Sequence, residues 1–198
     1  MSYGEILYAI YVIILTNAVR SRTTPLSDRA KELREQTAHA TLLGEPFQWD
    51  VNYRYSRLES PRSIRILTLA YSSSFEAPLE CIVTEVSLDE GIQYTALSYA
   101  WESAEGTTPI LCEGKYLDVT KNCSRALHII RQRARTDINL WVDAICIDQN
   151  NTPPAIAERT QQIQIMGEIY RSAAHVVAWV GDHTGNSRTI CDFLTSVG

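Results

Sequence analysis

The chain has 198 residues, of which 45% are hydrophobic and 21% are charged, close to the averages of globular proteins. This length suits one domain of ordinary size plus an extension, and it allows a sizeable buried core. The formal net charge of -5 and the pI near 5.4 argue against nucleic acid or an acidic membrane surface as a partner, because either favours a basic face. We therefore expect an acidic globular domain that binds no nucleic acid.

The cysteines and histidines form no recognised pattern. Five cysteines are an odd number and include no CxxC pair, unlike a disulfide-rich secreted scaffold, so we expect reduced thiols in a cytoplasmic protein. The four histidines are scattered and form no HExxH motif, so no metal site is expected. No glycine-rich phosphate loop occurs, which argues against an ordinary dehydrogenase or NTPase.

An apolar segment near the N-terminus, Ile6–Ala18, is too short for a comfortable membrane span of about 20 residues. A signal peptide is disfavoured because no Lys or Arg precedes the segment. Arg20 and Arg22 follow it and could hold a marginal anchor at a cytoplasmic face. Three interpretations stay open: a helix packed on the domain or a partner, membrane contact through residues 6–19 as a peripheral or single anchor, and a signal peptide.

Residues 1–52 are expected to form an N-terminal extension with a surface helix. Thr24 and Pro25 have the pattern of an N-cap followed by proline at the first helical position, and the spacing of apolar residues predicts a helix over 25–39. From Tyr53 on, the pattern changes to short strands. We therefore place the main domain at residues 53–198.

The main domain begins with β-structure and then alternates helices with strands. Strands are predicted at Ile64–Leu69, Leu79–Val86 and Tyr94–Trp101, and a turn at Glu113–Lys115 predicts an inserted β-hairpin. The elements predicted after the hairpin are a helix capped by Thr120 or Asn122, a strand at Leu140–Ile145, a helix at Ile156–Ala173 with Ile163, Met166 and Ile169 on its apolar stripe, and a strand at His175–Val180. Alternation of strands with helices implies parallel pairing through right-handed crossovers. We predict an α/β fold: a mostly parallel sheet flanked by helices.

Several short blocks, in order, resemble the fungal heterokaryon incompatibility (HET) domain. The blocks are YTALSYAW (Tyr94–Trp101), TKN (Thr120–Asn122), AL (Ala126–Leu127), LWVDAICIDQ (Leu140–Gln149), ER (Glu158–Arg159), QIQIM (Gln162–Met166), IY (Ile169–Tyr170) and WVG (Trp179–Gly181). The resemblance covers about Tyr53 to Gly181, roughly two thirds of the chain. The chain departs from the family pattern at Glu102, where glycine is usual, at Cys123, where leucine is usual, and at Asp148, where asparagine is usual. Because members of the family commonly continue much further, we expect a domain truncated at its C-terminus.

The resemblance implies a role in self/non-self recognition between fungal individuals that leads to programmed cell death. It also implies a distant similarity to TIR domains, and hence a TIR-like or Rossmann-like fold. Two mechanisms follow: assembly with protein partners or with itself into a signalling oligomer, or cleavage of a nicotinamide dinucleotide. NAD would then be a substrate, and no cofactor is expected. A third hypothesis is a non-catalytic module that docks on a partner or a membrane through its apolar segment.

Two carboxylates are candidates for catalysis. Asp143 ends a predicted strand, where its carboxylate either meets a ligand or bonds nearby backbone N–H groups. Glu158 begins a helix, where it is favourable to the helix dipole in any case; as a catalyst it would stabilise a developing ribosyl cation. Arg159 could hold a phosphate by bidentate bonds or pair with Asp143 or Asp148.

The remaining candidates are ligand-binding residues. Tyr99 and Trp101 either stack on a base or pack in the core. Gln149 and Gln162 either serve the same pocket or bond loop backbone. Cys146, between two isoleucines, is interpreted as a buried, inert thiol.

Overall fold

The computed structural model describes residues 52–100 and 106–179. The predicted N-terminal helix, the apolar segment and Trp101 therefore lie outside the described residues. The strands are β1 (Ser63–Leu69), β2 (Glu80–Ser87), β3 (Thr95–Tyr99), β4 (Thr107–Cys112), β5 (Lys115–Thr120), β6 (Ile138–Val142) and β7 (His175–Trp179). The helices are the short 3-10 helix η1 (Leu88–Glu90), α2 (Lys121–Arg133), α3 (Asp143–Cys146) and α4 (Pro153–Ser172).

The strands form one mixed sheet in the order β5-β4-β2-β1-β6-β3-β7. The α/β class is as predicted, but the prediction of a mostly parallel sheet is wrong. β1 pairs antiparallel with both β2 and β6, and β4 pairs antiparallel with β5; the parallel pairs are β2–β4, β3–β6 and β3–β7. All seven residues of β1 are buried. A strand can be buried on both faces in either direction, so this burial gives no indication of how β1 pairs.

A tight hairpin joins β4 to β5. Glu113 and Gly114 both adopt the left-handed conformation, with φ angles of 52° and 71°, as a two-residue type I′ turn requires. Glycine adopts this conformation at no steric cost, whereas Glu113 does so against its preference. Pairing then runs from Cys112 opposite Lys115 to Thr107 opposite Thr120.

Each long helix begins at a threonine cap. Thr120 Oγ1 accepts a hydrogen bond from the Cys123 N–H at 3.2 Å, so Thr120 caps α2. Thr152 caps α4 in the same way and Pro153 follows at the first position, so α4 starts three residues before the predicted Ile156. The predicted apolar stripe of α4 is wrong at Ile163, which is 57% exposed.

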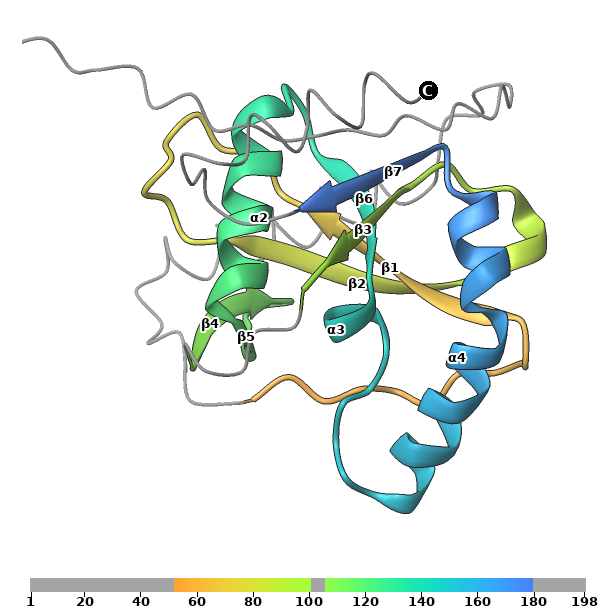
Figure 1. Ribbon diagram of the computed structural model, residues 1–198. Helices are drawn as coiled ribbons and strands as arrows, with labels where there is room; N and C mark the ends of the chain where they lie inside the picture. Colours follow the sequence, from red (N-terminus) through yellow and green to blue (C-terminus); the bar gives the residue numbers. More distant parts are fainter. Residues whose placement is uncertain (1–51, 101–105, 180–198) are drawn as a thin grey trace, which may run out of the picture.

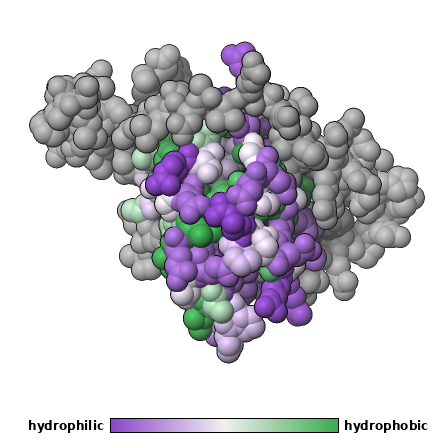
Figure 2. All heavy atoms as spheres, turned by 90° about the vertical axis from the view of Figure 1, so that its right-hand side faces the viewer, coloured by the Kyte–Doolittle hydropathy of each residue, from purple (hydrophilic) through white to green (hydrophobic). Residues whose placement is uncertain are grey.

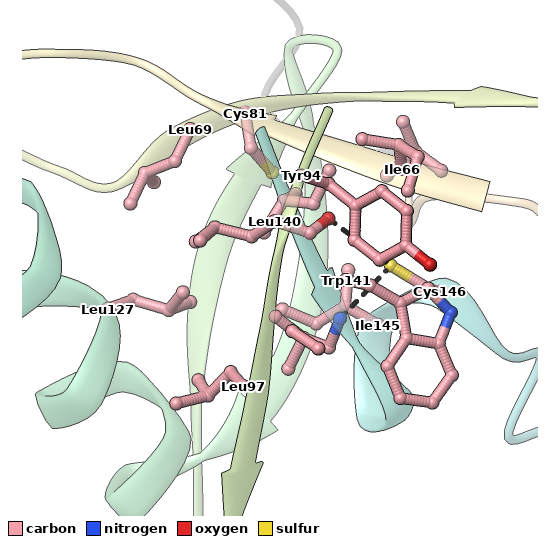
Figure 3. Packing of buried hydrophobic residues seen from close by; sticks show 14 of the residues in the cluster. Ile66, Leu69, Cys81, Tyr94, Leu97, Leu127, Leu140, Trp141, Ile145 and Cys146 are labelled. Carbon is pink, nitrogen blue, oxygen red and sulfur yellow. Dashed lines mark hydrogen bonds between the residues drawn. The ribbon is translucent and has the colours of Figure 1, made fainter. Parts of the chain in front are cut away.

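The helices cover both faces of the sheet. Figure 1 shows α2 and α4 on opposite sides of it. Figure 3 shows Leu127 of α2 facing Leu97 and Leu140 of the strands, while Trp141 lies on the other side of β6. On that other side, the Trp141 ring makes an edge contact with Tyr170 of α4, with the ring centroids 5.4 Å apart. Residues that alternate along β6 thus fill two separate core layers.

The strand predicted at Leu140–Ile145 ends earlier, at Val142. The next four residues turn into α3, where the Ile147 N–H donates to the Asp143 carbonyl at 3.2 Å. Cys146 folds back so that its Sγ accepts from the Val142 N–H at 3.3 Å. Ile145 and Cys146 are completely buried. Four residues, one of them Asp143, are too few to reveal a helical period, so the sequence pattern could not separate this turn from a strand.

A buried arginine holds the loop between β1 and β2. Arg131 of α2 is 2% exposed, and its guanidinium donates to backbone carbonyls of this loop. The acceptors are the carbonyls of Ser74 (3.3 Å), Phe75 (2.8 Å), Ala77 (2.7 Å) and Pro78 (2.6 Å). Arg131 Nη2 also lies 3.1 Å from His128 Nδ1, which must be the acceptor because arginine only donates. The imidazole is therefore neutral in this arrangement.

The neutral His128 predicts a specific pH dependence of stability. Burial and the charge of Arg131 lower the pKa of His128, against smaller opposing effects of the Phe75 carbonyl and Glu76. As pH falls below the ordinary histidine pKa of about 6.5, the unfolded chain binds this proton first, so the stabilisation present above that pH is lost. Between about pH 7.5 and about pH 5.5, urea midpoints should fall less for His128→Gln than for the wild type. Equal falls of the urea midpoint in the wild type and in His128→Gln would contradict this prediction. The control is His175→Gln, which replaces an exposed histidine.

Candidate functional site

Three parallel strands end at the same edge of the sheet. β3 ends at Tyr99, β6 at Val142 and β7 at Trp179, and their parallel registers place these ends together. Asp143 follows β6 directly. Ligand sites of open α/β sheets lie at the carboxyl ends of parallel strands, so this strand edge is the first place to look for a site.

Asn122 ties this strand edge together. Its Nδ2 donates to the Ala100 carbonyl just after β3 at 2.8 Å, and its Oδ1 accepts from the Trp179 indole N–H at 2.7 Å. The side chain thus joins the ends of β3 and β7 to the start of α2, and the residue is only 3% exposed. Sequence reasoning considered Asn122 only as an alternative helix cap. Its place in the TKN block was the one available signal of another role.

Asp143 follows β6 directly at the strand edge, and its charge acts on two tyrosines. Its Oδ1 accepts a hydrogen bond from the Ala144 N–H at 2.8 Å. A bond to a nearby backbone N–H was one of the two roles considered for this carboxylate. Burial chiefly raises the pKa of Tyr99 and of Tyr170, and the Asp143 charge raises both further. The Tyr99 hydroxyl is buried beside Cys123 and Thr120 without a well-formed hydrogen bond to either. The Asp143 charge therefore acts on Tyr99, although the Tyr99 hydroxyl has no hydrogen-bond partner among the described residues.

Glu158 is paired with an arginine that sequence reasoning did not consider. Arg65 of β1 donates from Nη1 to Oε1 at 2.6 Å and from Nη2 to Oε2 at 2.8 Å, with side chains 2% and 13% exposed. The Asp148 N–H also donates to Oε1, at 3.1 Å. Burial alone would raise the pKa of Glu158, but these hydrogen bonds and the Arg65 charge outweigh it and lower that pKa. The only local signal was one charged residue inside the apolar run SIRILTL.

Arg65 has partners on several segments besides α4. It donates to the carbonyls of Cys146 and Ser56, and its guanidinium carbon lies 5.0 Å from the centre of the Tyr55 ring. Tyr55 in turn donates from its hydroxyl to the Ile145 carbonyl at 3.0 Å. The Arg65–Glu158 pair therefore fixes α3 and the start of α4 against β1.

The other predicted binding residues mostly contact backbone. Gln149 Nε2 donates to the carbonyls of Asp143 and Ile147, both at 3.1 Å. Arg159 donates to the backbone carbonyl and to the Oε1 of Gln149, both at 3.3 Å, rather than to Asp143 or Asp148. Gln162 is fully buried and donates to the Ser63 carbonyl at 2.9 Å. Gln149 and Gln162 thus brace separate segments.

A cleft of about 590 Å³ lies between residues 55–61 and the start of α4. Glu158 and Asp148 line it, whereas Tyr99, Asp143 and Arg159 do not. The candidate residues therefore divide between the strand edge, with Tyr99 and Asp143, and the start of α4. Within residues 52–100 and 106–179, no three His, Cys, Asp or Glu side chains are grouped to hold a metal ion.

The main domain matches a known protein family. The model of the family described as heterokaryon incompatibility protein (HET) matches residues 94–196, more than half of the chain. The chain belongs to the HET family. It is 29% identical over 147 residues to heterokaryon incompatibility protein 6, OR allele, of Neurospora crassa; the match covers 68% of this chain and 21% of that relative. The chain thus spans about a fifth of the length of this relative. No solved structure matches.

Two of the three departures from the HET pattern, Asp148 and Cys123, have simple structural explanations, whereas Glu102 lies outside the described residues. At Asp148 the contact with Glu158 comes from the backbone N–H, while the side chain bonds the backbone and side chain of Asn150. An aspartate in place of asparagine therefore leaves the Glu158 contact unchanged. Cys123 is completely buried at the start of α2 and fills a core position, as leucine would.

The α4 side of the HET domain is mainly hydrophilic. Figure 2 shows hydrophobic side chains there in small groups among hydrophilic ones. Ile156 and Ile163 on α4 are 47% and 57% exposed, and single exposed apolar residues of this kind are common on soluble surfaces. None of the helices among the described residues is both long and apolar enough to cross a membrane.

Proposed function

We propose that this HET domain acts in fungal heterokaryon incompatibility as a signalling module that triggers programmed cell death. The observation that carries the proposal is membership of the HET family, together with the similarity to a Neurospora incompatibility protein. The signal would pass through protein partners or self-association in the cytoplasm. The strand edge with Asp143 and Tyr99 is our candidate for the functional surface.

Inducible expression in a filamentous fungus tests this proposal. Two variants each replace one carboxylate by an amide of the same shape: Asp143→Asn at the strand edge, and Asp89→Asn in an exposed ion pair with Arg62. We expect growth arrest with the wild type and with Asp89→Asn, and growth with Asp143→Asn at the same protein level. Normal growth with abundant, folded wild-type protein would contradict the proposal.

A second candidate function is a TIR-like hydrolysis of NAD to nicotinamide and ADP-ribose. The observation in its favour is a carboxylate, Asp143, that directly follows a parallel strand and whose charge acts on Tyr99 and Tyr170. Cleavage needs a carboxylate to stabilise the ribosyl cation as the bond to nicotinamide breaks, and water then completes the reaction. Asp143 is the better candidate, because Arg65 engages both oxygens of Glu158.

Free nicotinamide separates the two functions. Purified protein incubated with NAD under conditions that favour oligomers should release nicotinamide if the second function holds, and Asp143→Asn should not. Growth arrest without any release of nicotinamide would remove the second function and leave the first intact.

A further inference from the structure

Two cysteines lie opposite each other where β2 pairs with β4, the shortest strand pairing of the described sheet, which we call the joint. Cys81 of β2 and Cys112 of β4 are direct partners in the parallel register, and both belong to the buried core. The described residues also include Cys123 and Cys146, neither of which has a cysteine as its strand partner. Neighbouring parallel strands bring opposed Cα atoms within the range that a disulfide spans. The two thiols are also near enough for their side chains to interact.

This joint connects the β4–β5 hairpin to the rest of the sheet. The β2–β4 register contains only the pairs Glu80–Leu111 and Cys81–Cys112, whereas β1 and β2 pair over seven positions. Two flanking backbone hydrogen bonds support it, from the Leu111 N–H to the Leu79 carbonyl and from the Glu113 N–H to the Cys81 carbonyl, both at 2.9 Å. A covalent bond here would therefore fasten the hairpin where few other bonds do.

We propose that Cys81 and Cys112 are a site of reversible disulfide formation that locks the β4–β5 hairpin to the sheet. With a low-molecular-weight disulfide such as oxidised glutathione, one cysteine attacks as a thiolate and releases one glutathione. The second cysteine then attacks the protein sulfur of the mixed disulfide and releases the other. Two protein thiols are oxidised, one glutathione disulfide is reduced to two thiols, and the protons of the protein thiols pass to the departing glutathione thiolates.

Burial sets the condition for this reaction. Cys81 is 4% exposed and Cys112 is fully buried, so an oxidant in solution reaches them only when the joint opens. The neighbouring Cys81 thiol and, after it, burial also raise the pKa of Cys112, which slows attack from the closed state. The disulfide should therefore form faster in urea too dilute to unfold the domain.

Peptide mapping of the full chain tests the proposal. The protein carries Cys191→Ser, since Cys191 lies outside the described residues, and is treated with oxidised glutathione with and without dilute urea. We expect a linked pair of peptides containing Cys81 and Cys112 that reductant separates, faster formation in urea, unlinked Cys123 and Cys146, and a Tm raised by about 5 °C. Cys123→Ser should still give the linked peptides, and Cys81→Ser should not. No link between Cys81 and Cys112, a preferred link elsewhere, or a Tm that does not rise would overturn the proposal.

Discussion

Glu158→Ala is expected to lower the free energy of unfolding by about 3–5 kcal/mol, the usual cost of removing one partner of a buried ion pair. The replacement leaves the Arg65 guanidinium, which is 2% exposed, without the carboxylate that accepts from both of its Nη groups. It also leaves the Asp148 N–H without its acceptor. Urea unfolding at neutral pH measures the loss. Arg159→Ala, at the next position in the sequence, is the matched control. The Arg159 side chain makes only long hydrogen bonds to Gln149, so its removal should lower the free energy of unfolding much less.

The pair can be distinguished from two independent residues by a double-mutant cycle. Arg65→Met and Glu158→Leu should each be strongly destabilising, because each leaves the partner's charge buried and unpaired. The double replacement removes both charges and should be clearly less destabilising than the sum of the two. The lowered pKa of Glu158 adds a pH signature. Its stabilisation is present above the ordinary glutamate pKa of about 4.3 and is lost as pH falls through the lower folded-state pKa. The pairing would be contradicted if the free-energy losses of the two single variants simply added in the double variant, and if Glu158→Leu lost stability at low pH as the wild type does.

Arg131→Ala should cost about 3 kcal/mol, since bonds from a charged, buried donor to several partly buried carbonyls are lost together. The carbonyls of Phe75, Ala77 and Pro78 would lose the short hydrogen bonds that Arg131 donates to them. These bonds connect the loop between β1 and β2 to α2. Hydrogen exchange in residues 70–79 should accelerate along with the loss of stability. Arg133→Ala, an exposed position on the same helix, is the control.

Lysine at position 131 gives a sharper version of this test. Arg131→Lys keeps the charge but offers a single nitrogen in place of the planar fork, so it should restore only part of the stability. Full recovery with lysine would show that charge, rather than the shape of the guanidinium, holds the loop. Unchanged exchange in residues 70–79 in Arg131→Ala would show that the loop is fixed by other contacts.

Local patterns in the sequence predicted local structure well. The apolar spacing of α2 was correct, and the cap was one of the two residues predicted, Thr120, because a helix has a period and a start signal that neighbouring residues carry. The direction of β1 could not be read in this way, because a strand buried on both faces has the same apolar run in parallel and antiparallel pairing. The start of α4 was predicted too late because the Thr152–Pro153 signal was assigned to a loop.

The candidate site was predicted only in part, because its decisive contacts join distant parts of the chain. Arg65 and Glu158 are 93 residues apart, and Asn122 and Trp179 are 57 apart. Nothing near Glu158 in the sequence indicates an arginine partner, so its interpretation rested on the helix dipole and on the HET resemblance. Asp143 was singled out from local sequence as the carboxylate at the end of a short apolar run, and it does follow β6 directly. Its role in a site stays a prediction.

Growth of a fungal host expressing the double variant Arg65→Met, Glu158→Leu tests most directly whether Glu158 acts through the fold or through chemistry. We expect the wild type and the folded double variant to arrest growth equally, because apolar side chains of similar length can pack between β1 and the start of α4 and keep α3, with Asp143, in place. Asp143→Asn should permit growth in the same experiment. Normal growth with a double variant that is folded and as abundant as the wild type would contradict the structural role of Glu158 and return it to the functional site.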